Sequence, residues 1–251
     1  MKKYTLLVVA ALIVLPTLGF SDTFSVQLGY FFPSAASDLW RTEFQNLSFY
    51  KSDFQSAVFG VSYEHFINPY VSLVLGVDTY SKTRSGFYND WVGYTLDQGD
   101  FAFPASQFNG DYSLLQTFSV SILPIQLSAK ITPMGRRGAF IPYFGGGVGM
   151  YIWNVRMLGD MVDFSDPYVV TDPQHGNVQV YPVDSVDVRE DNRITIGWQA
   201  FAGVMVPVGR RMTVAGEFKY NYAKGNMENF QGFDDFDLRS FQISLALNYW
   251  F

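Results

Sequence analysis

The sequence predicts an all-β protein, an eight-stranded antiparallel transmembrane β-barrel with up-and-down connectivity. Three observations predict it. Apolar and polar residues alternate in eight segments, the connections between these segments are alternately short and long, and the polar faces carry few charges. The eight segments are 23–30, 57–64, 71–78, 118–130, 144–152, 196–204, 214–222 and 240–251.

The first three segments alternate without interruption. In a strand, residues two apart share a face, so one face of each segment is apolar and the other is polar. We expect the apolar faces to point outward to lipid. Their residues are Phe24, Val26, Leu28 and Tyr30; Ala57, Phe59, Val61 and Tyr63; and Val71, Leu73, Leu75 and Val77.

The fourth segment changes phase at Leu123-Pro124. Its apolar residues stand at even positions from Phe118 to Ile122 and at odd positions from Ile125 to Ala129. One extra residue, a β-bulge, would produce this shift, and proline tolerates a bulge because a bulged residue need not donate to the ladder. We therefore expect a bulge here. The alternative is that Pro124 ends the strand.

The last four segments alternate again, and they complete an even number of strands. The polar positions hold mainly Gly, Ser, Gln, Ala and Asn, which suits a narrow interior. The apolar residues are Phe144, Val148, Met150 and Ile152; Ile196, Trp198, Ala200, Ala202 and Val204; Val214, Phe218, Tyr220 and Tyr222; and Phe241, Ile243, Leu245, Leu247, Tyr249 and Phe251.

Short and long connections alternate along the chain. Short turns are expected at 67–69, 132–138 and 207–211, and long loops at 32–53, 82–116, 154–193 and 225–237. Barrels of the outer membrane have this asymmetry, together with aromatic girdles at both interfaces. The expected girdles are Phe24, Tyr143, Tyr249 and Phe251 at one end, and Tyr30, Trp198 and Tyr222 at the other. A soluble barrel or sandwich is the alternative, but its water-facing side would carry more charge.

Composition excludes several other classes. With 18% aromatic residues the chain is not expected to be disordered. The absence of cysteine excludes disulfides and thiolate chemistry, and the two histidines, His65 and His175, leave little for a zinc site. The net charge of −6 argues against a nucleic-acid partner.

Residues 1–21 are predicted to be a secretory signal peptide, which leaves 22–251 as the barrel domain. The segment starts with basic residues, continues with an apolar run at 6–15 and has small residues at −3 and −1 of the expected cleavage site. The alternative is a transmembrane anchor. Pro16 interrupts the run, which is shorter than the roughly 20 residues that a helical span needs.

Two segments resemble strands of the OmpW/OmpX-like outer-membrane β-barrel proteins, which are small Gram-negative eight-stranded barrels. Pro142–Tyr151 resembles their PY-x-G-x-G-x-G strand, and Gly197–Val204 resembles the strand after their third long loop. Tyr249-Trp250-Phe251 is similar to the signal that the barrel-assembly machinery reads. The resemblance implies location in the cell outer membrane, contact with outer-membrane lipid and lipopolysaccharide, and insertion by that machinery.

The polar faces contain a few charged residues that we expect to meet inside the barrel. Buried charges need partners, so Lys130 and Lys219 are expected to pair with the three acids in a charge network that fills the lumen. A proton or ion path is the alternative. The acids are Glu64, Asp78 and Glu217. The glycines of 145–149 do not form a dinucleotide fingerprint, because no helix pattern follows; they are expected to leave room for Tyr151 and Phe201.

Two of the long loops have unusual compositions. Segment 154–193 has eight acidic residues against three arginines, without the spacing of an EF-hand, so solvation is favoured over Ca²⁺ or Mg²⁺ binding. Segment 82–116 has eight aromatic residues, which are expected to pack on one another; the alternative is a site for an apolar ligand.

These features predict a non-enzymatic protein with a structural or surface-interaction role through four extracellular loops. No catalytic, cofactor-binding or metal-binding residue is predicted. One alternative is an OmpW-like conduit for a small hydrophobic ligand, with an apolar tunnel behind the aromatics of 82–116. A lipid A-modifying enzyme is less favoured: it needs a serine and a histidine at the outer rim, whereas His65 adjoins a short turn and His175 has no serine partner nearby in sequence.

Overall fold

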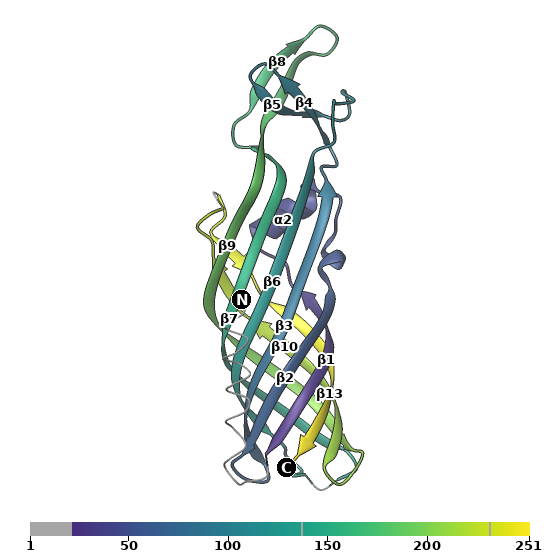
Figure 1. Ribbon diagram of the computed structural model, residues 1–251, viewed down its shortest axis with the longest axis vertical. Coiled ribbons are helices and arrows are strands. Elements are labelled where there is room, and N and C mark those ends of the chain that lie inside the picture. The colour runs from purple at the N-terminus through teal and green to yellow at the C-terminus, as the bar shows by residue number, and fades with distance from the viewer. Residues whose placement is uncertain (1–21, 137, 231) are drawn as a thin grey trace.

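The computed structural model describes residues 22–136, 138–230 and 232–251, and it confirms the eight-stranded antiparallel barrel (Figure 1). β13 pairs with β1 from Trp250 and Thr23 to Ser240 and Pro33, and this pairing closes the sheet. The barrel strands are β1 (Thr23–Pro33), β2 (Ser56–Phe66), β3 (Val71–Phe87), β6 (Leu115–Ile131), β7 (Ile141–Val162), β9 (Gly176–Pro207), β10 (Met212–Tyr222) and β13 (Ser240–Trp250). The predicted signal peptide lies outside the described residues.

Large apolar side chains cover the outside of the barrel. Leu28, Leu245 and Ile196 are 65%, 67% and 70% exposed, and similar side chains stand on every barrel strand. A continuous apolar surface of this kind is unfavourable in water and favourable in a bilayer. We call it the belt. None of the helices in the described residues is long and apolar enough to cross a membrane.

The two ends of the barrel differ in their connections. At the short-turn end, β2–β3, β6–β7 and β9–β10 are joined through 67–70, 132–140 and 208–211. At the long-loop end, the connections contain structure of their own (Figure 1). The first holds α2 (Asp38–Asn46) and the 3₁₀ turn η2 (Lys51–Phe54); the second β4 (Trp91–Leu96) and β5 (Gly99–Pro104); the third β8 (Tyr168–Asp172); and the fourth β11 (Lys224–Asn226) and β12 (Asp235–Asp237).

The prediction of a loop over 154–193 was wrong for most of its length. β7 and β9 stay paired up to Val162 and Val183, with one register shift between Met157 and Gly159. Above the belt their outward residues become polar, for example Asn154, Arg156 and Asn192. The backbone ladder continues into water, where an apolar face is not needed, so the hydropathy pattern ended before the strands did.

The predicted bulge at Leu123-Pro124 is also wrong. Pro124 pairs with Tyr151 and Ile125 with Met150, in unbroken register, and the even positions of β6 face the lumen along its whole length. The apolar residues change face because the lumen itself changes. It is apolar between Phe118 and Ile122, toward the long-loop end, and polar from Gln126 onward.

Candidate functional site: a filled lumen and a folded lobe

The half of the lumen nearer the short-turn end contains a polar layer built around two lysines. Lys130 Nζ lies 2.8 Å from Glu64 Oε2, and the Ser72 hydroxyl donates to the other oxygen of that carboxylate. Because Lys130 and Glu64 are both buried, the pair is shielded from solvent and neither charge is left alone.

The second lysine holds two carboxylates. Lys219 Nζ lies 2.9 Å from Asp78 Oδ2 and 3.7 Å from Glu217 Oε1. The Gln27 amide donates to Asp78, and the Tyr143 hydroxyl donates to Glu217 over 3.0 Å. The structure thus brings all five predicted charged residues into the lumen, in two groups. Tyr143 was assigned to the outer girdle by its aromatic character, but it is buried in this layer.

Amides and small residues complete the polar layer. Gln126 Nε2 donates to the Tyr151 hydroxyl and to Asn221 Oδ1, both over 2.9 Å. A Cβ on Gly145 would lie 2.5 Å from the Phe201 ring, so this glycine leaves room for Phe201, as expected; Tyr151 lies against Gly197 instead. A cavity of about 40 Å³ remains between the side chains, enough for a few water molecules.

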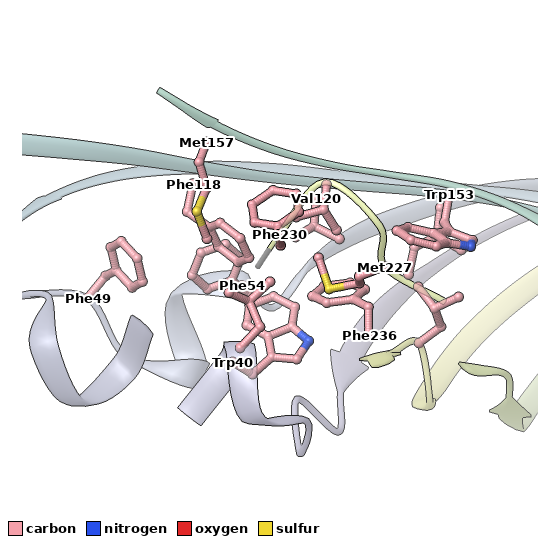
Figure 2. Close-up of a cluster of buried hydrophobic side chains, with 14 of the residues drawn as sticks. Trp40, Phe49, Phe54, Phe118, Val120, Trp153, Met157, Met227, Phe230 and Phe236 are labelled. Atoms are coloured by element: carbon pink, nitrogen blue, oxygen red, sulfur yellow. The ribbon is translucent and has the colours of Figure 1, made fainter. Parts of the chain in front are cut away.

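The half of the lumen nearer the long-loop end is closed by an aromatic plug (Figure 2). Side chains from the first and fourth connections pack against the inner wall of the barrel. The Trp40 ring, on α2, is 5.1 Å from Phe118 and 5.2 Å from Phe236, and its Nε1 donates to the Asp237 carbonyl over 3.2 Å. The plug consists of Trp40, Phe44, Phe49, Phe54, Phe230 and Phe236, against Phe118 and Trp153 of the wall.

Two aspartates hold the fourth connection over the plug. Asp191 is buried and accepts the backbone N–H groups of Glu228 and Asn229, each over 3.0 Å. Asp237 accepts the backbone N–H of Ala36 over 2.9 Å and two hydrogen bonds from the Arg239 guanidinium. Asp237 therefore links the first and fourth connections directly.

A buried carboxyl group joins α2 to the barrel. Glu43 Oε2 accepts from Gln116 Nε2 over 3.0 Å, and Gln116 Oε1 accepts from the Tyr88 hydroxyl over 2.7 Å. Among the described residues Glu43 has no ion pair. Burial raises the pKa of Glu43 to about 8, only partly opposed by the Gln116 hydrogen bond.

Replacement of Glu43 with glutamine is therefore expected to stabilise the protein in a pH-dependent manner. Between the ordinary pKa of 4.5 and about 8, the folded protein keeps a proton that the unfolded chain releases, so wild-type stability falls as the pH rises. Urea unfolding at about pH 4, 6 and 8.5 should show a difference between Glu43→Gln and wild type that widens with pH and then levels off. A constant difference would contradict this assignment.

Beyond the barrel, the second and third connections fold together into a lobe, which comprises residues 88–114 and 160–187. β4 pairs with β5, β5 pairs with β9 at Phe101–Pro182 and Ala102–Tyr181, and β8 pairs with β9. Figure 1 shows this small sheet above the long-loop end. Four of the eight aromatics of 82–116 pack together in the lobe, and three pack with the larger cluster that contains the plug, while Phe87 is exposed. The first four are Tyr94, Phe101, Phe103 and Phe108, and the other three are Tyr88, Trp91 and Tyr112.

The remaining predicted residues lie near the two ends. His65 Nδ1 is 2.9 Å from Asp22 Oδ1 at the short-turn end, and His175 Nδ1 is 2.9 Å from Asp172 Oδ1 at the tip of the lobe. Tyr249 and Phe251 are exposed, with ring centroids 6.3 Å apart, and the Trp250 ring is 6.2 Å from Phe66. Within the described residues, no group of three or more acidic or histidine side chains is arranged to hold a metal ion.

Comparison with known proteins gives structural matches alone. No family model matches the chain, and no curated protein matches it. The solved structures that match include three whose matches each cover 92% of this chain. Neisserial surface protein A is 14% identical, with 97% of its chain covered and a TM-score of 0.47. The outer membrane protein OprG of Pseudomonas aeruginosa is 11% identical, with 96% covered and a TM-score of 0.49. The attachment invasion locus protein Ail of Yersinia pestis is 9% identical, with 100% covered and a TM-score of 0.42.

The architecture of this chain specifies its membrane environment. Eight antiparallel strands form a closed sheet, the belt faces lipid, and the connections are short at one end and long at the other. These are the features of outer-membrane β-barrels.

Proposed function

We propose that this outer-membrane β-barrel is a surface-interaction protein that presents the lobe outside the cell on a filled, non-conducting barrel. The observation that carries the proposal is the fold of the lobe. Strands β7 and β9 rise together beyond the belt, and the far part of β9 pairs with β8 and β5. The paired strands β7 and β9 hold the packed sheet of the lobe rigidly, and a recognition surface needs such rigidity.

The filling of the lumen supports this role over the alternative of a conduit for small hydrophobic molecules. A conduit would need an apolar tunnel. Here the aromatic plug occupies the apolar half, and the described cavities in the lumen measure about 40 Å³ and about 10 Å³. Neither can hold more than a few water molecules.

The surroundings of the histidines support a non-enzymatic role. A lipid A-modifying enzyme would place a histidine beside a serine at the outer rim. His65 instead contacts Asp22 at the opposite end of the barrel, and His175 contacts Asp172 in an exposed turn.

The proposal also assigns partners to the barrel wall. The belt contacts outer-membrane lipid, and the barrel-assembly machinery inserts the folded strands. Directly beyond the belt, β3 and β6 carry outward hydroxyls that pair across the strands: Thr83 lies 2.9 Å from Ser119, and Ser85 lies 2.7 Å from Thr117. This polar surface is suited to the sugars of lipopolysaccharide.

The orientation can be tested by labelling, because the chain contains no cysteine. Gln174→Cys introduces a thiol at the exposed tip of the lobe, and Gly209→Cys introduces one in the turn between β9 and β10. A membrane-impermeant maleimide should label the Gln174→Cys variant in intact cells and the Gly209→Cys variant only after the outer membrane is permeabilised. The reverse pattern would place the lobe in the periplasm and refute the proposal.

A further inference from the structure

The lobe ends in an edge strand, β8, that has a neighbouring strand on one side only among the described residues. β8 pairs with β9 from Tyr168 and Val180 to Asp172 and Gly176, and none of the described residues pairs with its other side. A free edge presents a row of backbone N–H and C=O groups, which another extended chain can pair with.

Edge strands are usually protected against pairing by proline, lysine or a bulge, but at β8 this protection lies only at the two ends of the strand. Pro167 precedes β8 and Pro173 follows it, so the free edge is limited to five residues. Between the prolines there is no lysine and no bulge. Val169 is 67% exposed on the side facing away from the lobe, whereas Val170 packs against the lobe's own apolar cluster. The strand is therefore held in place by its inner face and open along its edge.

The charge of the lobe selects what can pair there. Residues 88–114 contain four aspartates and residues 160–187 contain six, and neither segment contains a lysine or an arginine. The lobe thus carries −10 in a chain whose total is −6, so the rest of the chain is net positive. A concentration of one sign attracts extended partners of the opposite sign and repels a second copy of the lobe.

From these observations we propose that the β8 edge is a docking site for a cationic polypeptide segment, which adds to the sheet as an extended strand with lysine or arginine alternating with apolar residues. The backbone ladder supplies the affinity, and the alternation lets one face of the incoming strand contact Val169 while its charges meet the aspartates. The inference rests on the proposed surface role and names the class of partner.

The test uses the purified full-length protein in detergent micelles and a fluorescent nine-residue peptide that alternates lysine and valine. A second peptide of the same sequence is N-methylated on the backbone at every internal residue, so that it keeps the lysine charges but has no internal backbone N–H donor on either edge. The first peptide should bind, and binding should weaken as salt is raised. The N-methylated peptide should bind at least about tenfold more weakly, because the backbone hydrogen bonds are lost.

Two variants with the same change of charge locate the site. Val169→Lys should weaken binding of the first peptide about tenfold, whereas Val188→Lys, on a 45% exposed residue of β9 away from β8, should change it less than about threefold. Equal binding of the two peptides, or equal effects of the two variants, would show attraction by charge alone and overturn the proposal. Absence of binding would overturn the proposal too. So would sedimentation that shows a dimer of the wild-type protein which Val169→Lys converts to a monomer, because β8 would then pair with a second copy.

The surface role and this inference can fail separately. Failure of the surface role would be seen in the labelling of the Gln174→Cys variant, which does not depend on any peptide. Correct labelling combined with no discrimination between the peptides would leave the lobe outside the cell and remove β8 as its docking strand.

Discussion

Replacement of Trp40 with alanine is expected to lower the free energy of unfolding by about 3–5 kcal/mol, the range for removing a large aromatic side chain from a packed core. Trp40 is buried at the centre of the aromatic plug, where its ring contacts Phe44, Phe54, Phe118 and Phe236. Its loss would leave a cavity and remove the hydrogen bond to the Asp237 carbonyl.

The effect can be measured as a shift in the urea concentration at which half of the protein is unfolded. The folded fraction is detected by its mobility on unheated gels. Tyr50→Ala is the matched control, because Tyr50 lies in the same connection and is 69% exposed. The control should stay within about 0.5 kcal/mol of wild type. If both variants unfold at the same urea concentration, the plug does not contribute to stability.

Lys219→Met should be destabilising to a similar extent, by about 3–5 kcal/mol, because it leaves a buried carboxylate without its cation. Lys219 lies 2.9 Å from Asp78 and 3.7 Å from Glu217, and all three are largely shielded from solvent. The methionine fills most of the same volume, so the loss reports charge and not packing.

The triple variant Lys219→Met, Asp78→Asn, Glu217→Gln provides the control, since it removes the whole charge group. It should recover most of the lost stability in the same urea titration, because neutral amides cost much less to bury than unpaired carboxylates. If the single variant matches wild type, or the triple variant is no more stable than the single one, the pairing in the polar layer is not as described.

The sequence was sufficient to predict the eight strands because lipid contacts one side of each strand. The alternation from Phe241 to Tyr249 records that contact directly, and every second side chain there is exposed on the belt. Alternation does not reveal which face is inside. The prediction therefore placed Phe118, Val120 and Ile122 on the outside, although they face the lumen. For the same reason the change of phase at Pro124 was interpreted as a bulge, whereas it reflects a change from apolar to polar side chains inside the barrel.

The candidate site was only partly predictable. The charged residues on the polar faces of the strands were expected inside the barrel. Which lysine pairs with which acid depends on the register between the strands, and this register places Lys130 beside Glu64 and Lys219 beside Asp78. The plug was missed, although Trp40 and Phe44 stand four residues apart, as on one face of a helix. The lobe was missed because its strands are short, and because β9 meets β5 from a distant part of the chain.

Hydrogen exchange in the lobe tests the central claim most directly, because a rigid recognition surface requires paired strands beyond the belt. In the purified protein, the amides of 100–103, 177–181 and 183 should exchange slowly, as the barrel strands do, while those of the turn at 97–98 between β4 and β5 exchange rapidly. Rapid exchange throughout 88–114 and 163–182, at the rate of an open loop, would contradict the account. The long connections would then be mobile segments, and neither the surface role nor the β8 edge would have a folded structure to support it.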